Sequence, residues 1–176
     1  MRKIILITGG ERSGKSAFAE RTALSLSPNP VYLATARVWD DEFRERVRRH
    51  QERRGPEWTN IEEELELSRH DLNGQVVVID CVTLWCTNFF YRDQQRAEQD
   101  RSWIGQCLKD LEAEFDRLTA QDAIFIFVTN EIGMGGVSAN TLQRRFTDFQ
   151  GWANQYIAGR ADEVMLMVSG IPVKIK

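Results

Sequence analysis

The sequence has little cysteine and no long hydrophobic run. Its three cysteines, Cys81, Cys86 and Cys107, form no C-x-x-C pair, which argues against a disulfide framework and a zinc finger. We therefore expect buried free thiols. No apolar run reaches the roughly 18 residues that a membrane span needs. The short run after Met1-Arg2-Lys3 leads into Gly9-Gly10 and is interpreted as a strand, not a secretion signal. These absences favour a cytoplasmic protein without a membrane span.

The chain also lacks a strong charge of either sign. It has 23 basic and 26 acidic residues and a net charge of −3, which argues against a bulk nucleic-acid binder. Only five of the 23 basic residues are lysine, and this arginine bias is typical of phosphate handling or of a codon preference. With 176 residues, 42% of them hydrophobic, the chain has the size and composition of one globular domain spanning 1–176.

Short apolar runs alternate with longer amphipathic stretches, which predicts an α/β domain with a mostly parallel sheet and helices on both faces. Strands are expected at 3–8, 31–35, 58–61, 76–80, 123–130, 163–168 and 173–176. Helices are expected at 15–26, 40–54, 62–70, 84–91, 94–119 and 142–158. The last two strands flank Ser169-Gly170 and predict a C-terminal β-hairpin.

One motif stands out between the first strand and the first helix. It fits G-x-x-x-x-G-K-[ST], the phosphate-binding P-loop, in the strand–loop–helix context that such a loop requires. Its backbone N–H groups and the following helix N-terminus would face phosphate oxygens. Lys15 would neutralise β- and γ-phosphate charge, and Ser16 would bind Mg²⁺. The motif comprises Gly9, Gly10, Glu11, Arg12, Ser13, Gly14, Lys15 and Ser16.

Asp80 ends the buried run Val76-Val77-Val78-Ile79. A carboxylate at the carboxyl end of a central parallel strand faces the ligand crevice and, beside a P-loop, is the expected second Mg²⁺ ligand. The alternative is a cap for the helix that follows.

His50 shares one face of the expected helix 40–54 with Phe43 and Val47, among several arginines. Spacing alone favours a half-buried helix residue over a chemical role. The sequence holds no N-K-x-D guanine-reading motif and no protein-kinase signature, so a small-molecule phosphotransferase is the expected class.

Several blocks resemble the bifunctional adenosylcobinamide kinase / adenosylcobinamide-phosphate guanylyltransferase family of cobalamin synthesis. The opening block Thr8–Ser16 contains a P-loop, which is a generic motif. Two other blocks are far more specific to the family: Thr129-Asn130-Glu131-Ile132-Gly133-Met134-Gly135 and the C-terminal block 161–176. Similar blocks occur in the family's order at 32–36, 40–42, 46–50 and 80–85. The resemblance implies a single P-loop, RecA-like domain.

The resemblance also implies roles for individual residues. His50 would take GMP from GTP as a guanylyl-histidine and pass it to adenosylcobinamide phosphate, after a kinase step that uses ATP or GTP, Mg²⁺ and Lys15. Arg49 occupies the position where some members have a second histidine. Family members are homotrimers and act on a corrinoid. Nucleotide contacts are expected at the P-loop and at Ala34, Thr35, Ala36, Gln51, Glu52, Arg53, Arg54, Glu62 and Asp80.

Two other functions fit the residues. A P-loop kinase for a different small metabolite would transfer the γ-phosphoryl group without a covalent enzyme. A nucleotide-dependent interaction protein could bind RNA or DNA through the arginine-rich helix, although the net charge of −3 argues against it.

Overall fold

The computed structural model describes residues 1–37 and 54–176, and the strands in these ranges form one seven-stranded sheet. Its order is β3-β2-β4-β5-β1-β6-β7, in which every pair is parallel except the antiparallel pair β6–β7. The strands are β1 (Lys3–Gly9), β2 (Val31–Ala34), β3 (Thr59–Glu62), β4 (Val76–Asp80), β5 (Ile124–Val128), β6 (Glu163–Val168) and β7 (Ile171–Lys174).

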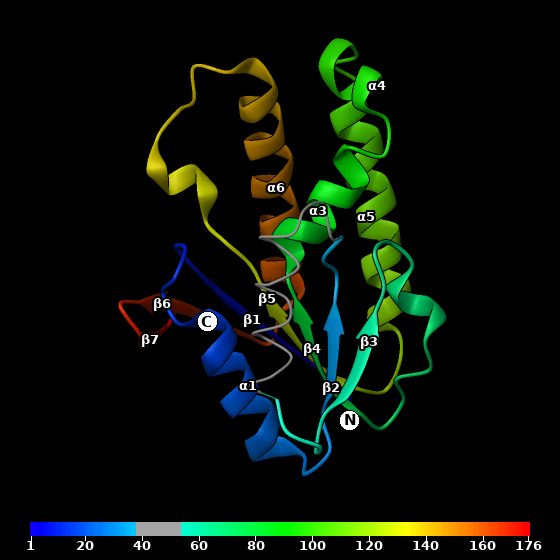
Figure 1. Cartoon of the computed structure of the whole chain (residues 1–176), viewed down its shortest axis with the longest axis vertical. Coiled ribbons are helices and arrows are strands. Elements are labelled where there is room, and N and C mark those ends of the chain that lie inside the picture. The colour runs from blue at the N-terminus through cyan, green and yellow to red at the C-terminus, as the bar shows by residue number, and fades with distance from the viewer. Residues whose placement is uncertain (38–53) are drawn as a thin grey trace.

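Helices cover both faces of this sheet, as predicted (Figure 1). Helix α1 (Lys15–Leu26) packs on one face, whereas α3 (Val82–Phe90), α5 (Trp103–Thr119) and α6 (Thr141–Arg160) pack on the other. The remaining helical segments are α4 (Gln94–Gln99) and the short 3-10 turns η1 (Leu67–Arg69) and η2 (Ile132–Gly135).

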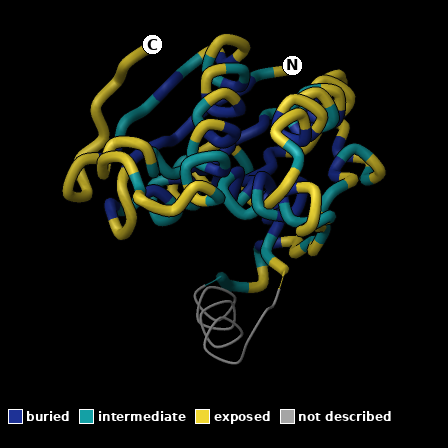
Figure 2. Tube along the Cα trace, turned by 90° about the horizontal axis from the view of Figure 1, so that it is seen from above, coloured by how far each residue is buried: buried dark blue, intermediate teal, exposed yellow. Residues whose placement is uncertain are grey.

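Alternation along the central strands explains the two-sided core. Ile4 and Leu6 of β1 face the α3–α5–α6 layer, and Ile5 and Ile7 face α1. Side chains of a strand point alternately to the two faces, so a strand covered on both faces is apolar throughout. Figure 2 shows the resulting buried strands between more exposed helices. The parallel arrangement brings the carboxyl ends of β1 to β6 to one edge of the sheet, where β1 leads into the P-loop.

The structure corrects two expected helices. Residues 62–70 are not one helix: Glu62 ends β3, and only Leu67–Arg69 form a 3-10 turn. The Glu63 carboxylate accepts the backbone N–H groups of Leu65 and Glu66 at 3.1 and 3.2 Å, a local bond pattern that competes with a helix.

The expected helix 94–119 is two helices, α4 and α5. The side chain of Asp100 accepts both the backbone N–H and the hydroxyl of Ser102 and so forms a turn between them. The predicted hairpin is present, although β7 begins two residues earlier than the strand expected at 173–176. Of the expected helix 40–54, only Arg54 lies within the described residues. None of the helices in the described part of the chain has the length and apolar character for a membrane span.

Candidate nucleotide site

The P-loop curls tightly between β1 and α1. Arg12 and Gly14 have φ values of 56° and 92°, and the Ser13 N–H bonds the Gly10 carbonyl at 3.3 Å. Successive turns of this kind point backbone N–H groups into one concavity, and α1 begins at its rim without a side-chain cap. The buried Lys15 ammonium donates to the Gly10 carbonyl and to Ser13 Oγ, 3.4 Å away. The loop therefore has the shape and charge to receive phosphate groups.

The C-terminal hairpin supports the outside of this loop. The Gly170 N–H donates to the Ser13 carbonyl at 3.0 Å. A Cβ on Gly9, whose φ is 151°, would lie 2.6 Å from the Met167 carbonyl oxygen. A Cβ on Gly14 would lie 3.3 Å from Gly170 Cα. Glycine at positions 9 and 14 is thus required by the close approach of β6 and the hairpin turn, as well as by the conformation of the loop.

Three other predicted contact residues lie in one row at the same edge. Ala34 of β2 is in register with Asp80 of β4 on one side and with Glu62 of β3 on the other. A cavity of about 730 Å³ next to this row is lined by Ala36, Arg37 and Glu62, followed by residues 63–66. The structure therefore places the P-loop, Asp80, the end of β2 and Glu62 along one edge of the sheet, although these segments are far apart in the sequence.

Tyr32 holds the Asp80 carboxylate. Its hydroxyl donates to Asp80 Oδ2 at 2.7 Å, and its ring is buried between the Arg54 guanidinium, 3.6 Å from the ring centre, and the edge of Trp58. Burial is the main reason that the pKa of Tyr32 is well above its usual value, and the Asp80 charge adds to the shift. The hydroxyl therefore remains a donor at neutral pH, and the sequence pattern did not indicate this contact.

Arg54 is the only described residue of the expected contact segment 51–54. Its Nε donates to Asn60 Oδ1 at 2.9 Å, whereas its buried Nη1 has no hydrogen-bond acceptor among the described residues.

Thr35, unlike Arg54 Nη1, has its polar groups hydrogen-bonded within the chain. Its N–H bonds the Asp80 carbonyl, its hydroxyl exchanges bonds with the Cys81 backbone, and its carbonyl accepts from Asn88. Thr35 thus joins β2 to β4.

A buried polar cluster adjoins the P-loop on the α6 side. Glu131, just after β5, donates its N–H to the Gly9 carbonyl at 3.2 Å and accepts the Thr8 hydroxyl at Oε1 at 2.8 Å. The remaining members link β5, α3 and α6 through side-chain hydrogen bonds; they are Thr83, Thr129, Asn130, Gln150 and Asn154. The sequence patterns assigned these residues no role, although the block Thr129–Gly135 was a signal for three of them, Thr129, Asn130 and Glu131.

The donor set suits Mg²⁺. This ion takes one or two protein oxygens and completes its shell with nucleotide phosphates and water. Ser16 is the second residue of α1, and Asp80 ends a strand, β4, that contacts α1. No cluster of three or more histidine, cysteine, aspartate or glutamate side chains in residues 1–37 and 54–176 forms a metal site by itself. Ser16 and Asp80 would therefore hold the ion together with a nucleotide.

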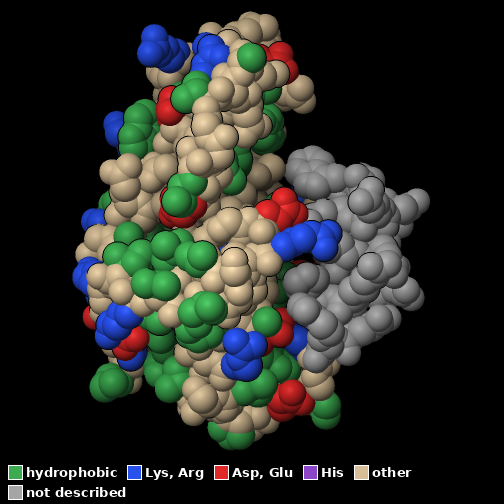
Figure 3. Space-filling view, turned by 90° about the vertical axis from the view of Figure 1, so that its left-hand side faces the viewer, with side chains coloured by type: hydrophobic (Ala, Val, Ile, Leu, Met, Phe, Trp, Pro, Cys, Tyr) green, Lys and Arg blue, Asp and Glu red, His purple; other side chains and the backbone are tan. Residues whose placement is uncertain are grey.

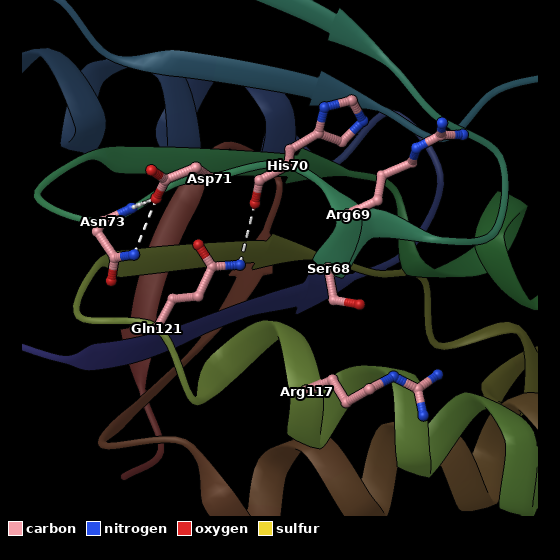
Figure 4. A pocket seen from close by; sticks show the side chains of 7 residues that line it. All are labelled: Ser68, Arg69, His70, Asp71, Asn73, Arg117 and Gln121. Carbon is pink, nitrogen blue, oxygen red and sulfur yellow. Dashed lines mark hydrogen bonds between the residues drawn. The ribbon is translucent and has the colours of Figure 1, made fainter.

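A second cavity, of about 390 Å³, lies at the opposite end of the sheet (Figure 4). Asn73 and Gln121 precede β4 and β5, and their side chains bond Asp71 and the His70 carbonyl. His70 follows the turn η1. These bonds stabilise chain turns, and the cavity lies far along the strands from the P-loop.

His50 and residues 51–53 lie outside the described residues.

The loop, the strand order and the carboxylate at the end of β4 define a P-loop NTPase domain of the RecA-like type, in which β5 lies between the P-loop strand and the Asp80 strand. A solved ATPase from a type III secretion system of pathogenic bacteria shares this fold, with a TM-score of 0.56 and 11% identity over 93% of this chain and 50% of that one.

The model of the family described as cobinamide kinase / cobinamide phosphate guanyltransferase matches residues 5–175. The bifunctional adenosylcobalamin biosynthesis protein CobU of Escherichia coli is 40% identical over 98% of this chain and 99% of its own length. The corresponding protein CobP of Pseudomonas aeruginosa is 38% identical over 97% of this chain and 96% of its own. The chain belongs to this family of enzymes.

Proposed function

We propose that this enzyme phosphorylates adenosylcobinamide and then transfers GMP from GTP to the adenosylcobinamide phosphate, giving adenosylcobinamide-GDP. The observation that carries the proposal is the P-loop at the same sheet edge as Asp80, Ala34 and Glu62, in a chain that matches the cobinamide kinase family over 5–175. The family match supports the choice of acceptor, and the geometry supports the nucleotide site.

In the kinase step, the P-loop backbone and Lys15 bind the β- and γ-phosphates of ATP or GTP. Lys15 exchanges its bonds to Gly10 and Ser13 for phosphate oxygens. Mg²⁺, held by Ser16 and Asp80, would neutralise charge that develops on the phosphates. The γ-phosphoryl group passes to the acceptor hydroxyl.

In the guanylyl step, the His50 imidazole attacks the α-phosphorus of GTP, and pyrophosphate leaves. The phosphate of the corrinoid then attacks the guanylyl-histidine, and His50 is regenerated. Ala34, Ala36, Glu62 and Arg54 are proposed nucleotide contacts, as are residues 51–53. Thr35 is a proposed contact as well, and its hydrogen bonds within the chain hold β2 against β4.

A product analysis distinguishes this function from that of a simple kinase. The enzyme is incubated with cobinamide, Mg²⁺ and ATP, then with GTP, and the corrinoid is analysed by mass spectrometry. The proposal predicts a phosphorylated corrinoid first and a GDP-linked corrinoid after GTP is added. A phosphorylated corrinoid that never receives GMP supports a kinase alone, and an unchanged corrinoid supports a kinase for another metabolite.

We also propose a homotrimer, which the exposed apolar side chains of the hairpin support (Figure 3). Val168, Ile171 and Val173 are 50, 65 and 46% exposed on one terminal hairpin. Exposed apolar patches of this kind commonly form contacts between subunits. A trimer also offers clefts between subunits for the large corrinoid. A cytoplasmic location is proposed with it, supported by three buried unpaired thiols. No nucleic-acid partner is proposed.

A further inference from the structure

We propose that Glu131 is the general base of the kinase step, which accepts the proton of the acceptor hydroxyl. This inference rests on the proposed function, because it assigns the base for the alcohol that the kinase phosphorylates. Glu131 lies in the block Thr129–Gly135, which the nucleotide-contact assignments leave without a role.

The strand order brings Glu131 next to the P-loop. It follows β5, which pairs directly with β1, and Val128 of β5 is in register with Ile7, two residues before the P-loop. The Glu131 N–H bonds the carbonyl of Gly9, the first residue of the loop. Oε1 accepts the Thr8 hydroxyl at 2.8 Å and the Asn154 amide at 3.3 Å. The carboxylate is thus fixed beside Thr8, the residue that precedes the P-loop.

The hydrogen bonds on the Glu131 carboxylate involve only one of its two oxygens. The Thr8 hydroxyl and the Asn154 amide both donate to Oε1, and no ion pair joins Glu131 to a cation in the described part of the chain. The side chain is half-buried, so it is accessible to an acceptor. A carboxylate that is held at one oxygen keeps its other oxygen in a fixed position, where an acceptor hydroxyl can reach it.

Other carboxylates at this edge are less suitable. Asp80 accepts the Tyr32 hydroxyl and is the proposed Mg²⁺ ligand. Glu62 ends β3, which is separated from β1 by β2, β4 and β5. Glu63, beside it, caps two backbone N–H groups and lies near Arg69 and His70, which together hold its pKa below the usual value. Among these four residues, only Glu131 adjoins the P-loop strand.

The chemistry of the two steps gives Glu131 a role in only one of them. In the kinase step the acceptor O–H bond breaks, and its proton passes to the Glu131 carboxylate. The oxygen bonds to the γ-phosphorus, the bond from that phosphorus to the bridging oxygen breaks, and the nucleoside diphosphate leaves. Glu131 then returns the proton to water. In the guanylyl step the attacking groups are an imidazole and a phosphate, and neither is an alcohol that must lose a proton.

The test compares wild-type enzyme with Glu131→Gln in three assays. Glutamine keeps an oxygen that accepts from Thr8 and Asn154 but is not basic. We expect the kinase kcat with ATP and cobinamide to fall roughly 100- to 1000-fold. Binding of a fluorescent GDP and covalent labelling by α-labelled GTP are expected to remain within about threefold of wild type. Glu163→Gln, at the amino end of β6, is the control. It is expected to keep the kinase kcat, the binding of GDP and the covalent labelling of the wild type.

Thr8→Val provides a second variant of nearly equal volume. It removes the 2.8 Å donor to Oε1, and we expect a smaller kinase loss, with labelling retained. Kinase activity of Glu131→Gln within about threefold of wild type overturns the inference. A parallel loss of kinase activity, nucleotide binding and labelling also overturns it, because that outcome shows a structural role. If wild-type enzyme gives neither product, the proposed function fails, and the inference fails with it.

Discussion

The Tyr32 hydroxyl donates a 2.7 Å hydrogen bond to Asp80, across two paired strands and 48 positions of sequence. Because Oδ2 of Asp80 is held in this way, the orientation of the carboxylate is fixed before a nucleotide binds. Tyr32 is itself held between Arg54 and Trp58. Tyr32 is therefore a positioning residue for the proposed Mg²⁺ ligand.

Tyr32→Phe is expected to weaken Mn²⁺ binding, measured by electron paramagnetic resonance with GDP present, by about 10-fold. The phenyl ring keeps the packing between Arg54 and Trp58, whereas Asp80 loses its fixed orientation. The matched control is Tyr156→Phe, which removes a 2.8 Å hydroxyl bond to Asp116 between α6 and α5. Equal Mn²⁺ affinity in Tyr32→Phe and wild type would show that the bond does not prepare the site.

Gly9→Ala is expected to reduce the affinity for GDP by at least about 10-fold and to lower the melting temperature. The added Cβ would lie 2.6 Å from the Met167 carbonyl, so either the loop or β6 must shift. Gly10→Ala is the control, because a Cβ there meets nothing within 4 Å and its φ is not in the left-handed region. Isothermal calorimetry compares the two variants, and equal losses would refute the specific role of the β6 contact.

The three thiols are expected to resist modification in the folded protein. Burial, with the neighbouring Asp80 charge, raises the pKa of Cys81 to about 12, and burial raises the pKa of Cys107 to about 12. At pH 8 we expect Ellman's reagent to react at least about 100-fold more slowly with native than with denatured protein. One rapidly reacting thiol in native protein would contradict the buried placement.

The same shifts predict how stability depends on pH. A thiol with a higher pKa in the folded state holds its proton more tightly there. Its contribution to the stability of the fold is therefore constant at pH values below its pKa in the unfolded state. Stability should then decline as the pH rises from about 8.5 towards the folded values. Melting temperatures measured between pH 7 and pH 10.5 test this sign. A rise in melting temperature across that range would contradict it.

Ile171→Glu is expected to reduce self-association, because it places a charge on the exposed apolar hairpin, where Ile171 is 65% exposed. Leu24→Glu, on α1, is the control, because Leu24 is 40% exposed on a different element. Light scattering coupled to size-exclusion chromatography should show trimers for wild type and Leu24→Glu and smaller species for Ile171→Glu. A wild-type monomer would refute the proposed assembly.

Local signals predicted the parts of the site that depend on neighbouring residues. The P-loop and Asp80 were recognised because a glycine-rich motif and a buried strand each have a local pattern. The sheet, the two-sided helix cover and the hairpin followed from the alternation of elements. The helix expected at 62–70 failed because the Glu63 side chain bonds nearby backbone N–H groups, an effect that periodicity does not register.

The proposed roles of Tyr32 and Glu131 could not be predicted from neighbouring residues in the sequence. Glu131 meets Thr8 across 123 positions only because β5 inserts between β1 and β4, and strand order is a property of the whole chain. Tyr32 meets Asp80 because β2 pairs with β4 in one particular register. Thr35 stays a nucleotide contact predicted from resemblance, and its hydrogen bonds to Cys81 also depend on how β2 pairs with β4.

Covalent guanylylation of His50 is the central claim, and labelling tests it most directly. Wild-type enzyme and His50→Asn are incubated with GTP labelled at the α-phosphate and Mg²⁺, without corrinoid. The account predicts protein-bound label in wild type that survives base, is lost in acid and is absent from His50→Asn, as expected for a phosphoramidate. Wild-type protein that is folded and binds GTP but takes up no label would contradict the guanylyltransferase mechanism.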